Sequence, residues 1–209
     1  ATFTISSDGA WPTEVAELEH DTALGTYNSL CQVDSDTYAL AYNGTPNDGF
    51  IKTFTISSDG ATITQVASLE HSGRGHWNSI VQVDSDTYVL AYTGDDYAGY
   101  IKTFTISSDG VTIEEVASLE HDTDYGKYNS LCQVDSDTYV LAYAGPGDDG
   151  FIKTFTVSSD GETITQVASL EHDTDHAKFN SIIQVDSDTY LLAYAGPGDS
   201  DGFIKTFTI

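Results

Sequence analysis

An aromatic residue followed by Asn-Ser occurs four times in this sequence, and this pattern is the one best suited to ligand chemistry. A Glu-His pair stands a short loop before each copy. Aromatic rings can cover the C–H groups of a sugar, while asparagine and histidine can hydrogen-bond its hydroxyl groups. The candidate ligand-binding residues are therefore His20, Tyr27, Asn28, His71, Trp77, Asn78, His121, Tyr128, Asn129, His172, Phe179 and Asn180.

The same pattern also fits a purely structural role. The aromatic residue could pack between repeats while the asparagine caps a turn. The exchange among Tyr27, Trp77 and Phe179 suits either interpretation, because all three side chains are large and flat. The sequence alone leaves both open.

Acidic loop residues form a second candidate site. Ca²⁺ prefers roughly six to eight oxygen ligands from carboxylates and carbonyls. The segment Asp199-Ser-Asp-Gly202 matches part of a calcium-binding Asp-x-Asp-x-Asp-Gly loop, without its third aspartate or its distal glutamate. No cofactor is expected to be required, and the alternative is a solvated turn. The residues that could hold Ca²⁺ or another ion are Asp48, Asp148, Asp149, Asp199 and Asp201.

Catalysis finds little support in the sequence. The four repeated histidines indicate a structural or fourfold binding role, because an active site is normally built once. The sequence contains no Gly-x-Ser-x-Gly and no His-Glu-x-x-His segment. We therefore expect a protein that is not an enzyme.

The charge restricts the partners. The chain has 33 Asp and Glu against 7 Lys and Arg, a formal net charge of −26. Such a chain lacks the basic patch that phosphate backbones and anionic membranes require. No apolar run approaches the ~18 residues of a membrane-spanning helix. We expect a carbohydrate or a protein surface as partner, no nucleic acid, no membrane insertion, and a secreted or cell-surface location.

The motif Val-Asp-Ser-Asp-Thr-Tyr sets the repeat. Its first aspartate falls at Asp34, Asp84, Asp135 and Asp186, so the spacing is 50, 51 and 51 residues. Each period holds four short segments rich in β-branched and aromatic residues, bounded by turn residues. Ser58-Asp-Gly60 and Asp34-Ser-Asp-Thr37 predict tight turns. In the first full period, the predicted strands are 28–33, 38–42, 50–56 and 62–70.

A repeated antiparallel sheet of about 50 residues is typical of a β-propeller blade. Over its full length the chain resembles the highly repetitive, recently amplified bacterial β-propellers, and its blade length is similar to that of tachylectin-type lectin propellers. It has no WD dipeptide, no kelch double glycine and no clear Asp-box. Because related four-bladed propellers hold ions or water in their channel, the resemblance implies a central ion site.

Counting strands predicts how the ring would close. The third strand of the repeat occurs five times, at 1–5, 50–56, 100–106, 151–157 and 203–209, while the other strands occur four times. We therefore predict a single all-β domain over 1–209, a four-bladed β-propeller whose last blade is completed by the N-terminal strand 13–19. One third strand is then surplus. A monomer is expected, and a dimer joined through the surplus strand is the alternative.

The variable loops indicate where function lies. The loops after the second and fourth strands differ between repeats and share one end of the sheets, while the other turns are nearly constant. A rigid scaffold with variable loops is a common arrangement for a binding site. We expect a lectin-like, carbohydrate-binding module that uses this loop face. The alternative is a structural or surface-adhesion repeat, or an engineered scaffold, with no small-molecule ligand.

Overall fold

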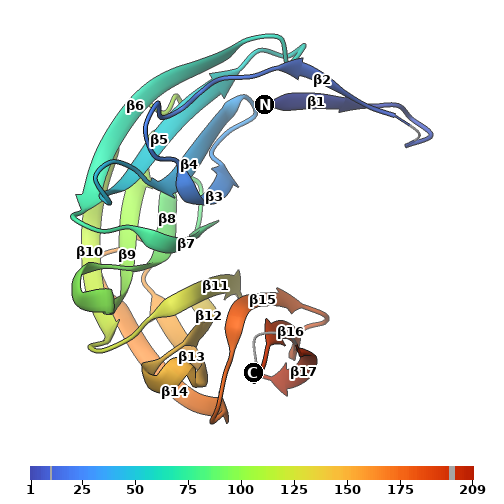
Figure 1. Cartoon of the computed structure of the whole chain (residues 1–209). Coiled ribbons are helices and arrows are strands. Elements are labelled where there is room, and N and C mark those ends of the chain that lie inside the picture. The colour runs from blue at the N-terminus through green and yellow to red at the C-terminus, as the bar shows by residue number, and fades with distance from the viewer. Residues whose placement is uncertain (10, 198–200) are drawn as a thin grey trace.

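The chain folds into five separate antiparallel sheets in the computed structural model, which describes residues 1–9, 11–197 and 201–209 (Figure 1). Three sheets have four strands, each in chain order from edge to edge. They contain β3 (Thr26–Gln32), β4 (Thr37–Asn43), β5 (Gly49–Ile56) and β6 (Ile63–Ser72); β7 (His76–Gln82), β8 (Thr87–Thr93), β9 (Gly99–Ile106) and β10 (Ile113–Asp122); and β11 (Lys127–Gln133), β12 (Thr138–Ala144), β13 (Gly150–Val157) and β14 (Ile164–Asp173).

The two ends of the chain form smaller sheets. The N-terminal hairpin pairs β1 (Thr2–Ile5) with β2 (Pro12–Ala16), and the C-terminal sheet contains β15 (Lys178–Gln184), β16 (Thr189–Ala195) and β17 (Gly202–Thr208). Short 3-10 turns, η1 (Asp95–Tyr97) and η2 (Pro146–Asp148), lie in two of the variable loops. Among the described residues, no helix is long and apolar enough to cross a membrane.

The expected four-bladed ring is wrong. The 17 described strands do not fit four blades, and β2 pairs with β1 instead of completing the C-terminal sheet. Figure 1 shows the result, an open arc with the hairpin at one end and β15–β17 at the other. The physical reason is a competition for β2, because the segments 2–5 and 206–209 are both Thr-Phe-Thr-Ile. Pairing across a short turn costs less loop-closure entropy than joining the two ends of the chain, so β2 pairs with β1 and not with β17.

The all-β repeat itself is confirmed, and so are its turns. Each predicted strand of the first full period overlaps one of β3–β6. The Oδ1 of Asp84 accepts the backbone N–H of Asp86 and of Thr87, at 3.2 and 3.0 Å, as an Asx turn should. Gly60 has φ = 73°, which a tight hairpin requires and glycine tolerates.

The core lies between consecutive sheets. Side chains alternate along the second strand, so one face of each sheet presents small residues and the other presents large ones. In the first interface, Ala39, Ala41 and Ile51 pack against the next sheet. We call this the small face, and we call the opposing side the large face, which there contains Ile80, Tyr88, Leu90, Tyr92 and Phe104. The next two interfaces repeat this pairing.

Three hydrogen bonds recur between neighbouring sheets. In the first interface, the backbone N–H of Ile80 donates to Ser29 Oγ at 3.0 Å, and Thr53 Oγ1 donates to the Gly110 carbonyl at 2.6 Å. Asn78 Nδ2 donates to the Tyr27 carbonyl at 3.1 Å. The serine and asparagine bonds recur at the next two interfaces, and the threonine bond recurs from Thr103 to Gly161. Each sheet is therefore held to the next by the packing of a small face on a large face and by recurring hydrogen bonds.

Candidate functional site

The four repeated aromatic residues meet in one continuous row. Ring centroids of successive residues are 5.0, 4.9 and 4.7 Å apart, so each ring touches the next. The row and the four neighbouring asparagines line a shallow depression of about 200 Å³. The structure thus brings together eight of the predicted ligand-binding residues, which we call the aromatic row: Tyr27, Asn28, Trp77, Asn78, Tyr128, Asn129, Phe179 and Asn180.

A β-bulge at the start of each first strand aims the aromatic side chains. Thr26 lies opposite Asn43 and Ser29 opposite Ala41, so three steps on β3 face two on β4. All four aromatic residues have φ between 48° and 55°, a left-handed conformation that is unusual for a bulky side chain. Bulges redirect side chains, and such outliers persist where the surroundings hold them. The same outlier in every repeat makes the row a property of the fold.

The asparagines hold the bulges in place. Asn78 Nδ2 donates to the Gly75 carbonyl at 2.8 Å within its own repeat, in addition to the Tyr27 carbonyl across the interface. The Oδ1 atoms of Asn78, Asn129 and Asn180 are buried and accept no hydrogen bond from the described part of the chain. An unsatisfied buried acceptor is costly, so these amides combine a structural contact with unused hydrogen-bonding capacity.

The repeated histidines do not join the aromatic row. His71 and His121 are buried. Each ring lies edge-on to a tyrosine ring of the following sheet, and the ring centroids are 4.7 Å apart for His71 and Tyr92 and 4.8 Å apart for His121 and Tyr143. His20 and His172 make the same contact with Tyr42 and Tyr194. A strand lysine donates to each histidine carbonyl.

Burial decides the charge of these histidines. Removal from water lowers the pKa of His71 and His121 to about 3, and the nearby Lys102 and Lys153 lower it further in the same direction. Burial likewise lowers the pKa of His172 to about 4. These rings are therefore neutral at physiological pH and act as packing elements behind the loops.

A different histidine lies at the row. His76 has its ring centroid 4.9 Å from that of Tyr27 and 5.4 Å from that of Trp77. Sequence reasoning missed it because it occurs in one repeat only. Its position directly before Trp77 was the available signal. Burial and the nearby Arg74 lower its pKa, so it presents a neutral ring.

A cluster of cations and tyrosines extends the row into the variable loops. Arg74 lies over the ring of Tyr97 at 4.5 Å, and Lys127 lies over that of Tyr125 at 3.8 Å. Tyr97 and Tyr125 stack at 5.7 Å, and Lys127 is also 5.8 Å from the Trp77 ring. Arg74, Tyr97 and Tyr125 each occur in one repeat only, so the repeated sequence pattern did not indicate this cluster.

The acidic candidates do not gather. Within residues 1–9, 11–197 and 201–209, no group of three or more His, Cys, Asp or Glu side chains could hold a metal ion. Asp148 instead pairs with Lys178 at 3.2 Å. The backbone carbonyls of Asp48, Asp149 and Asp201 each accept a loop N–H at 2.8 Å. Asp199 lies outside the described residues.

No protein-family model and no curated protein matches this sequence. Several solved structures are similar in fold. A putative exo-beta-1,3-galactanase from Bifidobacterium bifidum aligns with a TM-score of 0.63 and 13% identity over 99% of this chain and 78% of its own. A mutant of the NanB sialidase from Streptococcus pneumoniae aligns with a TM-score of 0.62 and 11% identity over 93% of this chain and 32% of its own. The chain spans 35% of another similar structure, the Hadza microbial sialidase Hz136, at a TM-score of 0.57, 16% identity and 83% coverage of this chain.

At these identities the likeness shows the fold alone. It is consistent with a propeller-like series of sheets, and it establishes no named family, tachylectin-type or other. Carbohydrate-active enzymes are among the proteins that share this fold, and the chain covers only a part of several of them.

Proposed function

We propose that this chain is a non-enzymatic carbohydrate-binding module that holds a glycan along the aromatic row. One observation carries the proposal: four aromatic rings, each in a left-handed bulge, line a single depression together with four asparagines. The carbohydrate-active enzymes among the similar folds support the same ligand class.

The chemistry of the row suits binding better than turnover. Its side chains are aromatic rings and amides. Rings cover the apolar faces of sugars, and amides exchange hydrogen bonds with hydroxyl groups. Tyr27 and Phe179 are exposed at its two ends. Neutral aromatic and amide groups do not provide the acid and base that hydrolysis needs near neutral pH. Successive rings would act as linked weak subsites, so affinity should grow with glycan length.

A glycan array followed by titration of any hit tests this function. We expect Trp77→Ala to weaken binding roughly ten-fold, about 1.4 kcal/mol. The matched control is Trp11→Ala, because Trp11 is exposed and does not line the depression. Equal glycan binding by wild type and Trp77→Ala would contradict the proposal. Absence of binding to any glycan on the array, both with and without calcium, would contradict it as well.

A structural role of the same residues is the second candidate. The hydrogen bonds from the Asn78 and Asn129 side chains favour this role, because they reach the backbone carbonyls of aromatic residues in the preceding sheet and so join sheets without any ligand. Loss of a buried large aromatic typically costs about 3–5 kcal/mol. A lower melting temperature of Trp77→Ala, together with no glycan binding by wild type, would favour a repeat scaffold or adhesion module.

A further inference from the structure

The two ends of the arc expose complementary apolar faces. At the N-terminal end the large face of the first sheet is open in part, because Leu30 is 66% exposed, whereas the equivalent Ile80 is 5% exposed. Leu40, Tyr42 and Phe54 of the same face are already buried, and the N-terminal hairpin contacts this sheet where Thr2 Oγ1 donates to the Gly60 carbonyl at 2.7 Å. At the C-terminal end the small face of β15–β17 is open, and Ile204 is 71% exposed, whereas the equivalent Ile51 is fully buried. Inside the arc, these two kinds of face pack against each other three times.

The open faces also carry the two halves of the recurring polar contacts. At the N-terminal end, Leu30 N–H has no serine partner among the described residues, and Asn28 Nδ2 donates there only to the Gly25 carbonyl. At the C-terminal end, the Oγ of Ser181 and the carbonyl of Phe179 receive no such bonds from the described residues. The donors missing at one end are therefore present at the other.

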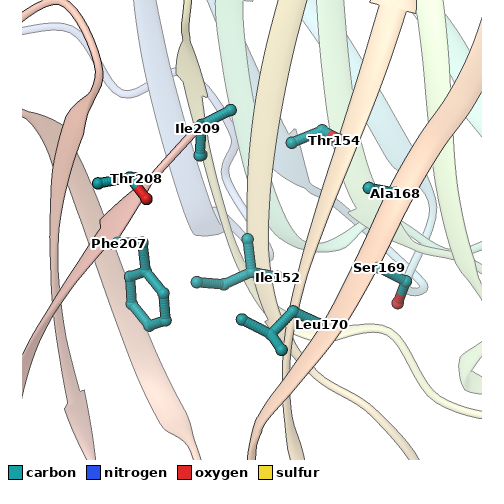
Figure 2. Close-up of a pocket in the computed structure, with 8 residues that line it drawn as sticks. All are labelled: Ile152, Thr154, Ala168, Ser169, Leu170, Phe207, Thr208 and Ile209. Atoms are coloured by element: carbon teal, nitrogen blue, oxygen red, sulfur yellow. The ribbon is translucent and has the colours of Figure 1, made fainter.

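A groove at the C-terminal end marks where a fourth strand would lie. It runs between β13–β14 and the end of β17 and is lined by Ile152, Thr154, Leu170 and Phe207, among others (Figure 2). Thr154 is equivalent to Thr53 and Thr103, whose hydroxyls each donate to the turn glycine of the following sheet. The missing pieces are thus a turn glycine and a fourth strand.

The N-terminal hairpin contains both pieces. Gly9 is the equivalent turn glycine, and a Cβ added to it would meet nothing within 4 Å. The strand β2 follows, with Val15 exposed, and Leu18 just after it is exposed too. Leu170, which lines the groove, is also exposed. In the described part of the chain, β1 alone pairs with the edge of β2 that β17 would need.

We propose that a second copy of this chain docks head to tail on this open end. Its β2 completes the sheet β15–β17 of the first copy, and its large face covers the exposed small face. The β17 strand replaces β1 of the second copy on β2, which is a strand exchange between identical Thr-Phe-Thr-Ile segments. Phe207 then takes the register of Phe3, opposite Glu14.

The observations favour a second copy over an unrelated partner. Leu30 and Ile204 are equivalent to Ile80 and Ile51, which lie in one buried cluster, and the unused donors of one end match the unused acceptors of the other. A head-to-tail contact uses two different surfaces, so two arcs can close into a ring through two equivalent contacts. Each copy carries a charge of −26, so added salt should strengthen the association by screening repulsion.

Sedimentation velocity over a range of protein and salt concentrations tests the proposal. We expect the 209-residue chain to form dimers that become more abundant with protein and with salt. Leu30→Asp and Ile204→Asp should each weaken association at least ten-fold. Both sites are exposed, so the variants should keep the circular dichroism spectrum of the wild type. The matched control is Val111→Asp, which changes an exposed residue in the turn between β9 and β10 of an interior sheet.

Mixing the two variants is the sharpest test. Leu30→Asp keeps an intact C-terminal face, and Ile204→Asp keeps an intact N-terminal face, so an equal mixture should form a dimer through one contact. A wild-type chain that stays monomeric at every concentration and salt overturns the proposal. Association that both variants leave unchanged, or that the mixture fails to restore, also overturns it. A basic protein partner would instead give a complex that salt weakens.

Discussion

Asn129 and Trp77 belong to different sheets, yet the side-chain amide of Asn129 donates to the backbone carbonyl of Trp77 at 3.2 Å. The same amide donates to the Gly126 carbonyl at 3.0 Å. One side chain therefore fixes its own bulge and anchors the left-handed residue of the preceding sheet. Equivalent bonds hold the carbonyls of Tyr27 and Tyr128, so this link supports three of the four residues of the aromatic row.

Replacing Asn129 by alanine should lower the free energy of unfolding by about 2 kcal/mol, because two carbonyls then lose their donor inside the protein. Urea unfolding of dilute protein measures this. The control is Asn28→Ala at the open end, where the amide bridges no preceding sheet among the described residues. Equal losses for the two variants would contradict the proposed link.

Acid should destabilise the protein before its carboxylates protonate. The native state keeps His71, His121 and His172 neutral, with pKa values of about 3, 3 and 4, whereas an unfolded histidine titrates near 6.5. The unfolded state therefore binds more protons between these values. Their stabilising contribution is complete above about pH 6.5 and falls as the pH drops, by about 1.4 kcal/mol per pH unit and histidine.

Unfolding midpoints between pH 6.5 and 4.5 test this dependence. His121→Leu should remove close to one proton from the slope of stability against pH, whatever its effect on stability at pH 7. A slope equal to that of the wild type would show that His121 does not titrate on unfolding.

Calcium should have little effect on stability. The described acidic side chains do not assemble into a group of three or more around a common point. We therefore expect excess Ca²⁺ to change the free energy of unfolding by less than the ~2.7 kcal/mol that a site gives at a hundred-fold excess over its Kd. A larger difference between melts in calcium and in EDTA would contradict this and would return attention to the acidic loops.

Gly99 should not tolerate a side chain. A Cβ there would lie 2.4 Å from the Cε1 of His121, so Gly99→Ala should cost about 1–3 kcal/mol through overpacking. Gly202 holds the equivalent position in the C-terminal sheet, where a Cβ meets nothing within 4 Å. Gly202→Ala is therefore the matched control, and thermal melts of dilute protein should show it close to wild type.

Local structure could be predicted from the sequence, and ring closure could not. The periodicity and turn residues of each repeat predict its four strands, because alternation and turn chemistry are local properties. Whether β2 pairs with β1 or β17 depends on two identical segments, so residue types cannot decide it. Only chain connectivity distinguishes them, and it favours the hairpin.

The candidate site was likewise predictable in part. The aromatic and asparagine residues adjoin in sequence and stay together in the fold. His71 stands six residues before Trp77, and that interval crosses a loop, so its ring is directed into the interior instead. The positive φ of Trp77 has no signal in residue type, because a bulky residue there is unusual.

The repeated pairing of a small face with a large face has a consequence for how such a chain can change in length. Duplication or deletion of one period of 50 or 51 residues would again place the small face of one sheet on the large face of the next, so no new type of interface between sheets would arise. Stability in such arrays is approximately a sum over units and their neighbours. The gene could therefore gain or lose whole units by recombination, and each product would inherit working contacts without any compensating substitution.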